Sequence, residues 1–126
     1  MGVGVVLVHR IHELKINKEN FMKYYTGVGS RKTPAEVLNL MFKIAIKLDT
    51  YGYILRSGGA IGADTAFEQG AGKNKRIFKA HDSNHDAEKI ASMFHPAWER
   101  CSEFARKLRG RNAFQVLGAD LNTPGN

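Results

Sequence analysis

Two glycine-rich turns, each between a strand-like and a helical segment, constrain the fold of this chain more than any other feature. The first covers residues 26–32 (TGVGSRK) and follows a strand-like segment at 24–26. The second covers residues 57–64 (SGGAIGAD) and follows a strand-like segment at 53–56. A further short strand is expected at residues 76–80. Strand, helix, strand, helix, strand at this spacing is typical of right-handed βαβ crossovers and a parallel sheet.

The helices between these strands have recognisable starts and apolar faces. Thr33 is expected as an N-cap, with Pro34 at the first helical position and Glu36 closing a capping box. The apolar residues that follow at helical spacing are Val37, Met41, Ile44 and Leu48. The next helix is expected from residue 63 to 71 and to end at Gly70 and Gly72.

Residues beyond 80 carry helical patterns and no further strand. One helix is expected to start near Ser83, with Asp86 completing a capping box; others are expected after Pro96 and near Asn112. On the helix after Pro96, Cys101 is expected to be a buried core residue. The prediction is an α/β, Rossmann-like three-layer fold with a parallel sheet and helices on both faces, incomplete at the C-terminus.

The chain is short enough to form one domain with an extension. Its 126 residues are typical of a single domain. Residues 1–22 are expected to be an N-terminal extension whose apolar run, 3–8, forms a short strand, and residues 23–126 the partial Rossmann-like domain.

Composition narrows the class of protein. No apolar run approaches the ~18 residues of a membrane-spanning helix, and the one cysteine allows no internal disulfide. A cytoplasmic location, without membrane contact, is therefore expected. Nineteen Lys and Arg against twelve Asp and Glu give a net charge of +7, which favours a polyanionic partner. The alternative is that this excess charge serves solubility alone.

The two turns are the strongest candidate for a binding site. Glycine lets the backbone approach a ligand closely, and the N-terminus of the following helix stabilises an anion. Both turns are expected at the carboxyl edge of the strands, where ligands of open α/β sheets bind. The alternative is that the glycines only make tight turns. The candidate phosphate-binding residues are Gly27, Gly29, Ser30, Arg31, Ser57, Gly58, Gly59, Gly62, Asp64 and Arg111.

These motifs resemble the SMF/DprA–LOG (SLOG) superfamily, and within it the DprA, or DNA-processing, branch. The chain is most similar to the small, phage-type DprA-like proteins. Gly-Ser-Arg at 29–31 and Ser-Gly-x-Ala-x-Gly-x-Asp at 57–64 fit the branch position by position, and Arg-Asn at 111–112 resembles a later segment. The resemblance covers residues 23–123. It implies a Rossmann-like fold, dimerisation, and binding of single-stranded DNA or, as in other members, a small nucleotide.

Two departures from the family pattern bear on activity. Glu68 stands where DprA proteins carry His, and the later Pro-Gly-Gly-x-Gly-Thr turn of the LOG branch has no counterpart. We therefore expect a protein that binds a nucleotide or nucleic-acid phosphate in DNA processing, recombination or phage–host signalling. The alternative is a LOG-type nucleoside-monophosphate N-glycosidase, with Asp64 and Glu68 as its candidate catalytic residues.

Further expectations concern metals, cofactors and assembly. The cluster at 81–86 (HDSNHD) fits no zinc signature, so no metal and no cofactor are expected. A three-stranded parallel sheet would leave exposed edges, so a twofold homodimer is expected. The strand at 3–8 is the element expected to cover an edge. A phage-encoded chain would work in the cytoplasm of a bacterial host.

Overall fold

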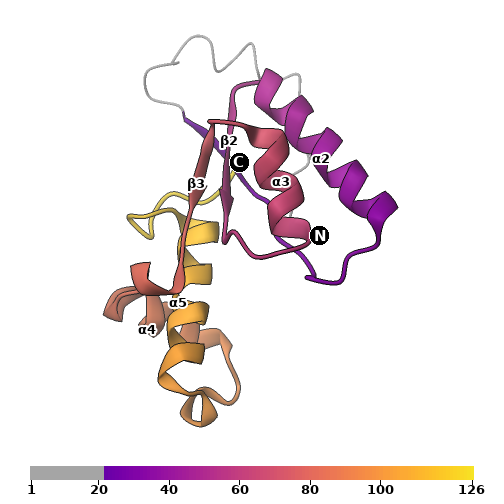
Figure 1. The fold of residues 1–126 in the computed structure, drawn as a ribbon. Coiled ribbons are helices and arrows are strands. Elements are labelled where there is room, and N and C mark those ends of the chain that lie inside the picture. The colour runs from indigo at the N-terminus through magenta and orange to yellow at the C-terminus, as the bar shows by residue number, and fades with distance from the viewer. Residues whose placement is uncertain (1–21) are drawn as a thin grey trace.

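A three-stranded parallel sheet organises the chain in the computed structural model, which describes residues 22–126 (Figure 1). Its strands are β1 (Lys23–Thr26), β2 (Tyr53–Ser57) and β3 (Lys75–Ile77), and β2 lies in the middle. Both strand pairs are parallel. The predicted α/β class and parallel sheet are confirmed, whereas the predicted strand at 3–8 lies outside the described residues.

Helices cover both faces of the sheet. Helices α2 (Ala35–Thr50) and α3 (Ala63–Ala71) pack together on one face. On the other, α5 (Glu103–Leu117) reaches β1 and β2, while α4 (His85–Phe94) packs on α5 away from the sheet (Figure 1). The short 3-10 helices η3 and η4 span Ala80–Asp82 and Trp98–Arg100. Within residues 22–126, no helix has the length and apolar character to cross a membrane.

Residues of β2 alternate between the two faces, as the pleat of a strand requires. Leu55 is fully buried in the apolar core beneath α2 and α3, with Tyr25 and Phe67 beside it. Arg56 points the other way and is buried too; its Nη1 donates to the carbonyls of Val116 (3.3 Å) and Thr123 (2.5 Å). The middle strand is therefore buried on both sides.

A small side chain allows α2 and α3 to approach closely. Gly70 lies inside α3, one residue before its end, and does not end the helix as predicted. A Cβ added to Gly70 would overlap the carbonyl oxygen of Phe42 and lie 2.6 Å from the Cβ of Ala45. Gly70 is therefore a packing residue, and Gly72, at φ +62°, follows the helix end.

Two predicted helix starts are wrong in detail. Thr33 does not cap α2 with its side chain: its Oγ1 donates to the carbonyl of Ser30 at 2.7 Å. Helix α4 is capped by Asn84, whose Oδ1 accepts from the N–H of Ala87 at 2.8 Å, and not by Ser83. In both places the hydroxyl expected to cap the helix donates elsewhere, that of Thr33 to the Ser30 carbonyl and that of Ser83 to the Glu88 carboxylate at 3.1 Å.

The two helices predicted after Pro96 are one continuous helix, α5. Ser102 caps it by accepting from the N–H of Ala105 at 3.1 Å. Gly110 lies inside it, and a Cβ there would overlap the Ser83 hydroxyl and lie 2.8 Å from the Cγ of Glu88, so the missing side chain allows α4 to pack closely on α5. Cys101 lies before the helix, half-buried, so its predicted core position on a helix is wrong.

Candidate functional site

The two glycine-rich turns meet at the carboxyl ends of the strands, as predicted, and bind each other directly. The N–H of Ala63, the first residue of α3, donates to the carbonyl of Ser30 at 3.1 Å. The fully buried hydroxyl of Ser57 donates to the carbonyl of Gly27 at 2.6 Å. Ser57 therefore holds the two turns together instead of presenting its hydroxyl to a ligand.

Glycines at this edge serve close packing between the turns. Gly62 has φ +86°, and a Cβ there would lie 2.6 Å from the Ser30 carbonyl oxygen and 2.8 Å from the Cα of Arg31. A Cβ on Gly27 would lie 2.6 Å from the Phe67 ring. Gly62 is therefore required by its backbone conformation and by the close approach of the first turn, and Gly27 by its contact with Phe67.

Asp64 joins both turns through its carboxylate. The residue is 5% exposed. Its Oδ1 accepts from the N–H of Gly29 at 3.3 Å, and its Oδ2 from the N–H groups of Gly58 (3.3 Å) and Ala60 (3.4 Å). The carboxylate thus spans from the first turn to the second and fixes their spacing.

Beside Asp64 lies an open cavity of about 470 Å³. Four of the predicted residues line it: Gly29, Arg31, Asp64 and Arg111. The other lining residues are Thr26, Val28, Ala60, Asn112, Gln115 and Val116. The cavity is therefore bounded by both turns and by one face of α5, segments far apart in the sequence.

Arg111 crosses from α5 to the turns. Its Nη1 donates to the carbonyls of Gly58 (3.2 Å) and Phe78 (3.1 Å). Burial lowers the pKa of the Arg111 guanidinium, Asp64 partly offsets this, and the like charge of Arg31 lowers the pKa further. Arg31 is exposed, and no residue in the described part of the chain bonds its guanidinium. Two cations therefore share the cavity with one carboxylate that is already bonded.

Lys79 is a cation at this edge that the sequence analysis missed. It follows β3, so the carboxyl end of the third parallel strand was the signal that could have found it. A Cβ on Gly59 would overlap its Nζ, and one on Gly58 would overlap the guanidinium of Arg111. The second turn therefore has a cation against each of its first two glycines.

The remaining predicted residues lie at the rim or outside the cavity. Ser30 is exposed, and its Oγ accepts from the N–H of Lys32 at 2.9 Å. Glu68 does not line the cavity; its carboxylate pairs with Lys75 at 2.8 Å. Asp64 and Glu68 are thus bonded to separate partners. No group of three His, Cys, Asp or Glu among residues 22–126 could hold a metal ion.

The basic residues of α5 do not form one surface. Arg106 donates twice to the carbonyl of Trp98, at 3.3 and 3.0 Å, and lies over its ring. Arg109 lines a separate apolar cavity of about 410 Å³ between α4 and α5. Of the arginines in this helix, Arg111 is the one that lines the cavity between the turns.

No protein-family model, no curated protein and no solved structure matches this chain. The similarity to the DprA branch therefore rests on the two turn motifs and on Arg-Asn at 111–112, and it stays a prediction.

Proposed function

We propose that this chain binds a phosphate group of a nucleotide or of single-stranded nucleic acid at the edge formed by its two turns. The observation that carries the proposal is the cavity between Arg31 and Arg111. The guanidinium of Arg31 can offer a phosphate two parallel N–H donors, the geometry that makes such contacts strong. Arg111 is already bonded through Nη1 to two carbonyls and through Nε to Asn112, so it contributes mainly its charge. The first turn of α3, whose end of the helix dipole favours an anion, borders the cavity through Asp64.

Charge balance in the cavity supports an anionic ligand. Arg111 is partly desolvated beside the like charge of Arg31, so an anion between them would relieve an unfavourable interaction. Asp64 would oppose a phosphate, but its oxygens accept three backbone N–H groups and its charge is partly offset. Lys79 adds positive charge on the other side of the second turn.

Binding is a better-supported function than N-glycosidase chemistry. A general acid or base must reach the reacting group in a suitable protonation state. Asp64 is buried and accepts three N–H groups, and Glu68 is paired outside the cavity. No observation therefore favours the glycosidase alternative, and incubation with nucleoside monophosphates, watching for free base, remains its direct test.

Titration against a labelled single strand and against nucleoside monophosphates, over a salt series, tests the proposal. Arg31→Ala is the informative variant, because Arg31 is exposed and makes no side-chain hydrogen bond among residues 22–126, so we expect its loss to leave the fold intact. Arg111→Lys keeps the charge but loses the guanidinium bonds to the Gly58 and Phe78 carbonyls that hold this side chain at the cavity. Arg109→Ala is the matched control, on the same helix but against the apolar cavity.

We expect Arg31→Ala to weaken binding and to reduce the slope of log affinity against log salt by about one unit. Arg111→Lys should weaken binding as well, and Arg109→Ala should not. Absence of binding by the wild-type chain at low salt would refute the proposal. An equal loss in Arg31→Ala and Arg109→Ala would do the same.

The resemblance to the DprA branch implies dimerisation, and we propose that this chain forms a twofold dimer. The outer edge of β1 is contacted by the C-terminal residues: Tyr24 and Asn126 exchange two hydrogen bonds, each at 2.9 Å. Among the described strands, β3 pairs only with β2, so its outer edge is the one for a partner copy. Light scattering at several concentrations tests this.

A cytoplasmic location in a bacterial host, with a phage as source, stays a prediction.

A further inference from the structure

An exposed phenylalanine lies on the helix that lines the phosphate cavity. Phe104 is in the first turn of α5, and 63% of its surface is exposed. Arg111 follows it seven residues later, which is close to two helical turns and places both on one stripe, about 10 Å apart along the axis. The stripe runs from Phe104 to the cavity.

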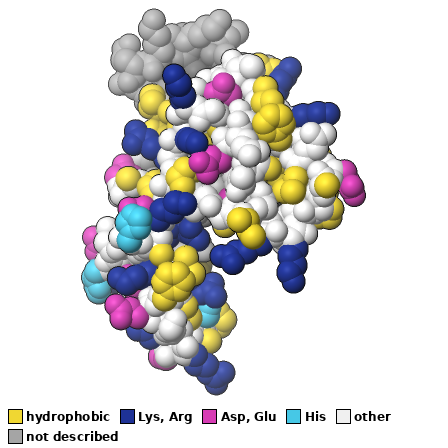
Figure 2. Space-filling model, in the orientation of Figure 1, with side chains coloured by type: hydrophobic (Ala, Val, Ile, Leu, Met, Phe, Trp, Pro, Cys, Tyr) yellow, Lys and Arg dark blue, Asp and Glu magenta, His cyan; other side chains and the backbone are white. Residues whose placement is uncertain are grey.

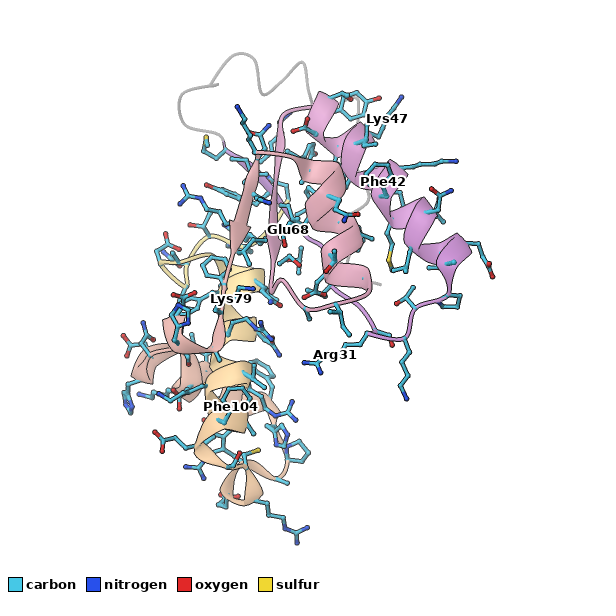
Figure 3. All side chains as sticks on the ribbon, viewed as in Figure 1. Arg31, Phe42, Lys47, Glu68, Lys79 and Phe104 are labelled. Atoms are coloured by element: carbon cyan, nitrogen blue, oxygen red, sulfur yellow. The ribbon has the colours of Figure 1, made fainter. Side chains whose placement is uncertain are left out.

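Positive charge accompanies this stripe. At the end of the stripe near the cavity, the second turn is flanked by three cations, Arg31, Lys79 and Arg111. Lys107, three residues after Phe104, is 42% exposed at its side chain and 4.0 Å from Glu103. Figure 2 shows Lys and Arg gathered across the junction between the sheet region and the α4–α5 region. In Figure 3, Arg31 extends from its turn toward α5, on which Phe104 lies.

A second exposed phenylalanine has different surroundings. Phe94, 80% exposed, lines the apolar cavity with Ile90 and Leu117, on the α4 side of α5. Its neighbours would suit an apolar partner. Phe104 instead lies three residues before Lys107 and on the helix face that leads to Arg111 and its cavity. This position suits a ligand that combines a flat apolar face with negative charge. An unpaired nucleobase on a phosphodiester backbone has both.

We propose that Phe104 is the stacking position for an unpaired base of a nucleic-acid strand whose phosphate occupies the cavity at Arg31 and Arg111. This rests on the proposed function and narrows it to a strand that places a phosphate at the cavity and a base on Phe104, two positions about 10 Å apart along α5. Proteins that bind single strands combine a cationic groove with aromatic side chains on which bases stack. The ligand is therefore single-stranded nucleic acid several nucleotides long.

The test compares Phe104→Ala with Phe94→Ala as the matched control. Binding is measured by fluorescence anisotropy with oligothymidylate and oligouridylate of about ten nucleotides, and with thymidine monophosphate by calorimetry. We expect Phe104→Ala to weaken binding of the single strand by roughly tenfold to hundredfold, the range of one base–aromatic stack. Affinity for the monophosphate should not change. Phe104→Tyr should restore strand binding, and Phe94→Ala should leave it unchanged.

An oligonucleotide without bases isolates the stacking contact. Wild type should bind this abasic strand more weakly than oligothymidylate, and Phe104→Ala should bind the two alike. The thymidylate and uridylate arms show which of DNA and RNA is preferred.

Several results would overturn the stacking role while leaving phosphate binding intact. One is that Phe104→Ala binds the single strand as tightly as wild type does. Another is that Phe104→Ala loses as much affinity for duplex DNA, or for the abasic strand, as for oligothymidylate. A change in self-association of Phe104→Ala, with strand affinity unchanged, would assign the residue to a protein contact instead. Failure of wild type to bind any of these ligands would refute the proposed function itself.

Discussion

Replacing Asp64 by Ala should separate the two turns and destabilise the whole domain. The carboxylate accepts from Gly29 in the first turn and from Gly58 and Ala60 in the second. Alanine would remove the acceptor of all three N–H groups, of which that of Gly58 is the buried one. Gln115 compensates in part, because its amide oxygen, turned toward Gly58, accepts from the Gly58 N–H at 3.0 Å.

The three bonds set the expected size of the effect. Hydrogen bonds to a charged group contribute about 1.5–3 kcal/mol each, but those at 3.3–3.4 Å are longer than the usual range and therefore weaker. Allowing about 1 kcal/mol for each gives a loss of about 2–3 kcal/mol in the free energy of unfolding. With a urea m-value of about 2 kcal/mol per M, the midpoint should fall by about 1 M.

Urea unfolding followed by circular dichroism measures this loss, with Glu68→Gln as the control on the same helix. The Glu68–Lys75 pair is about one-third exposed at each side chain, so breaking it should cost no more than about 1 kcal/mol. Asp64→Asn keeps the shape but turns a donor toward one set of N–H groups, and should lie between wild type and Asp64→Ala. A midpoint for Asp64→Ala equal to that of Glu68→Gln would refute the bridging role.

Two other substitutions test the core and the turns. Gly62→Ala should cost about 2 kcal/mol or more, because it forces φ +86° on alanine against the Ser30 carbonyl; an unchanged melting temperature would contradict this. Tyr25→Phe should be as stable as wild type, since the buried hydroxyl finds no hydrogen-bond partner among residues 22–126. Burial, and to a smaller extent the negative charge of Asp49, raises the pKa of Tyr25 above its usual 10.0. Above that pH the folded chain therefore keeps a phenol proton that the unfolded chain loses. Wild-type stability should therefore fall as pH rises above 10.0, and less so in Tyr25→Phe; identical pH profiles would disprove the burial effect.

The sequence by itself determined the alternation of strands and helices and the position of the two turns. Strand and helix periods differ, and glycine and proline mark the places where one gives way to the other, so these features are local. Parallel pairing follows from the helical connections between strands, and it brings the strand ends to one edge. The grouping of Gly29, Arg31 and Asp64 around one cavity fits that expectation, whereas Arg111 reaches it from α5.

The tertiary structure decided which of these groups face the cavity and which are used for packing. Ser57 and Asp64 are both bonded between the turns, and their partners lie 30 and 35 residues away in the first turn. Arg56 is a strand residue in the sequence, yet it is buried against carbonyls at the end of the chain. Hydrogen-bond partners of this kind are set by the packing of distant segments, and no local periodicity encodes them.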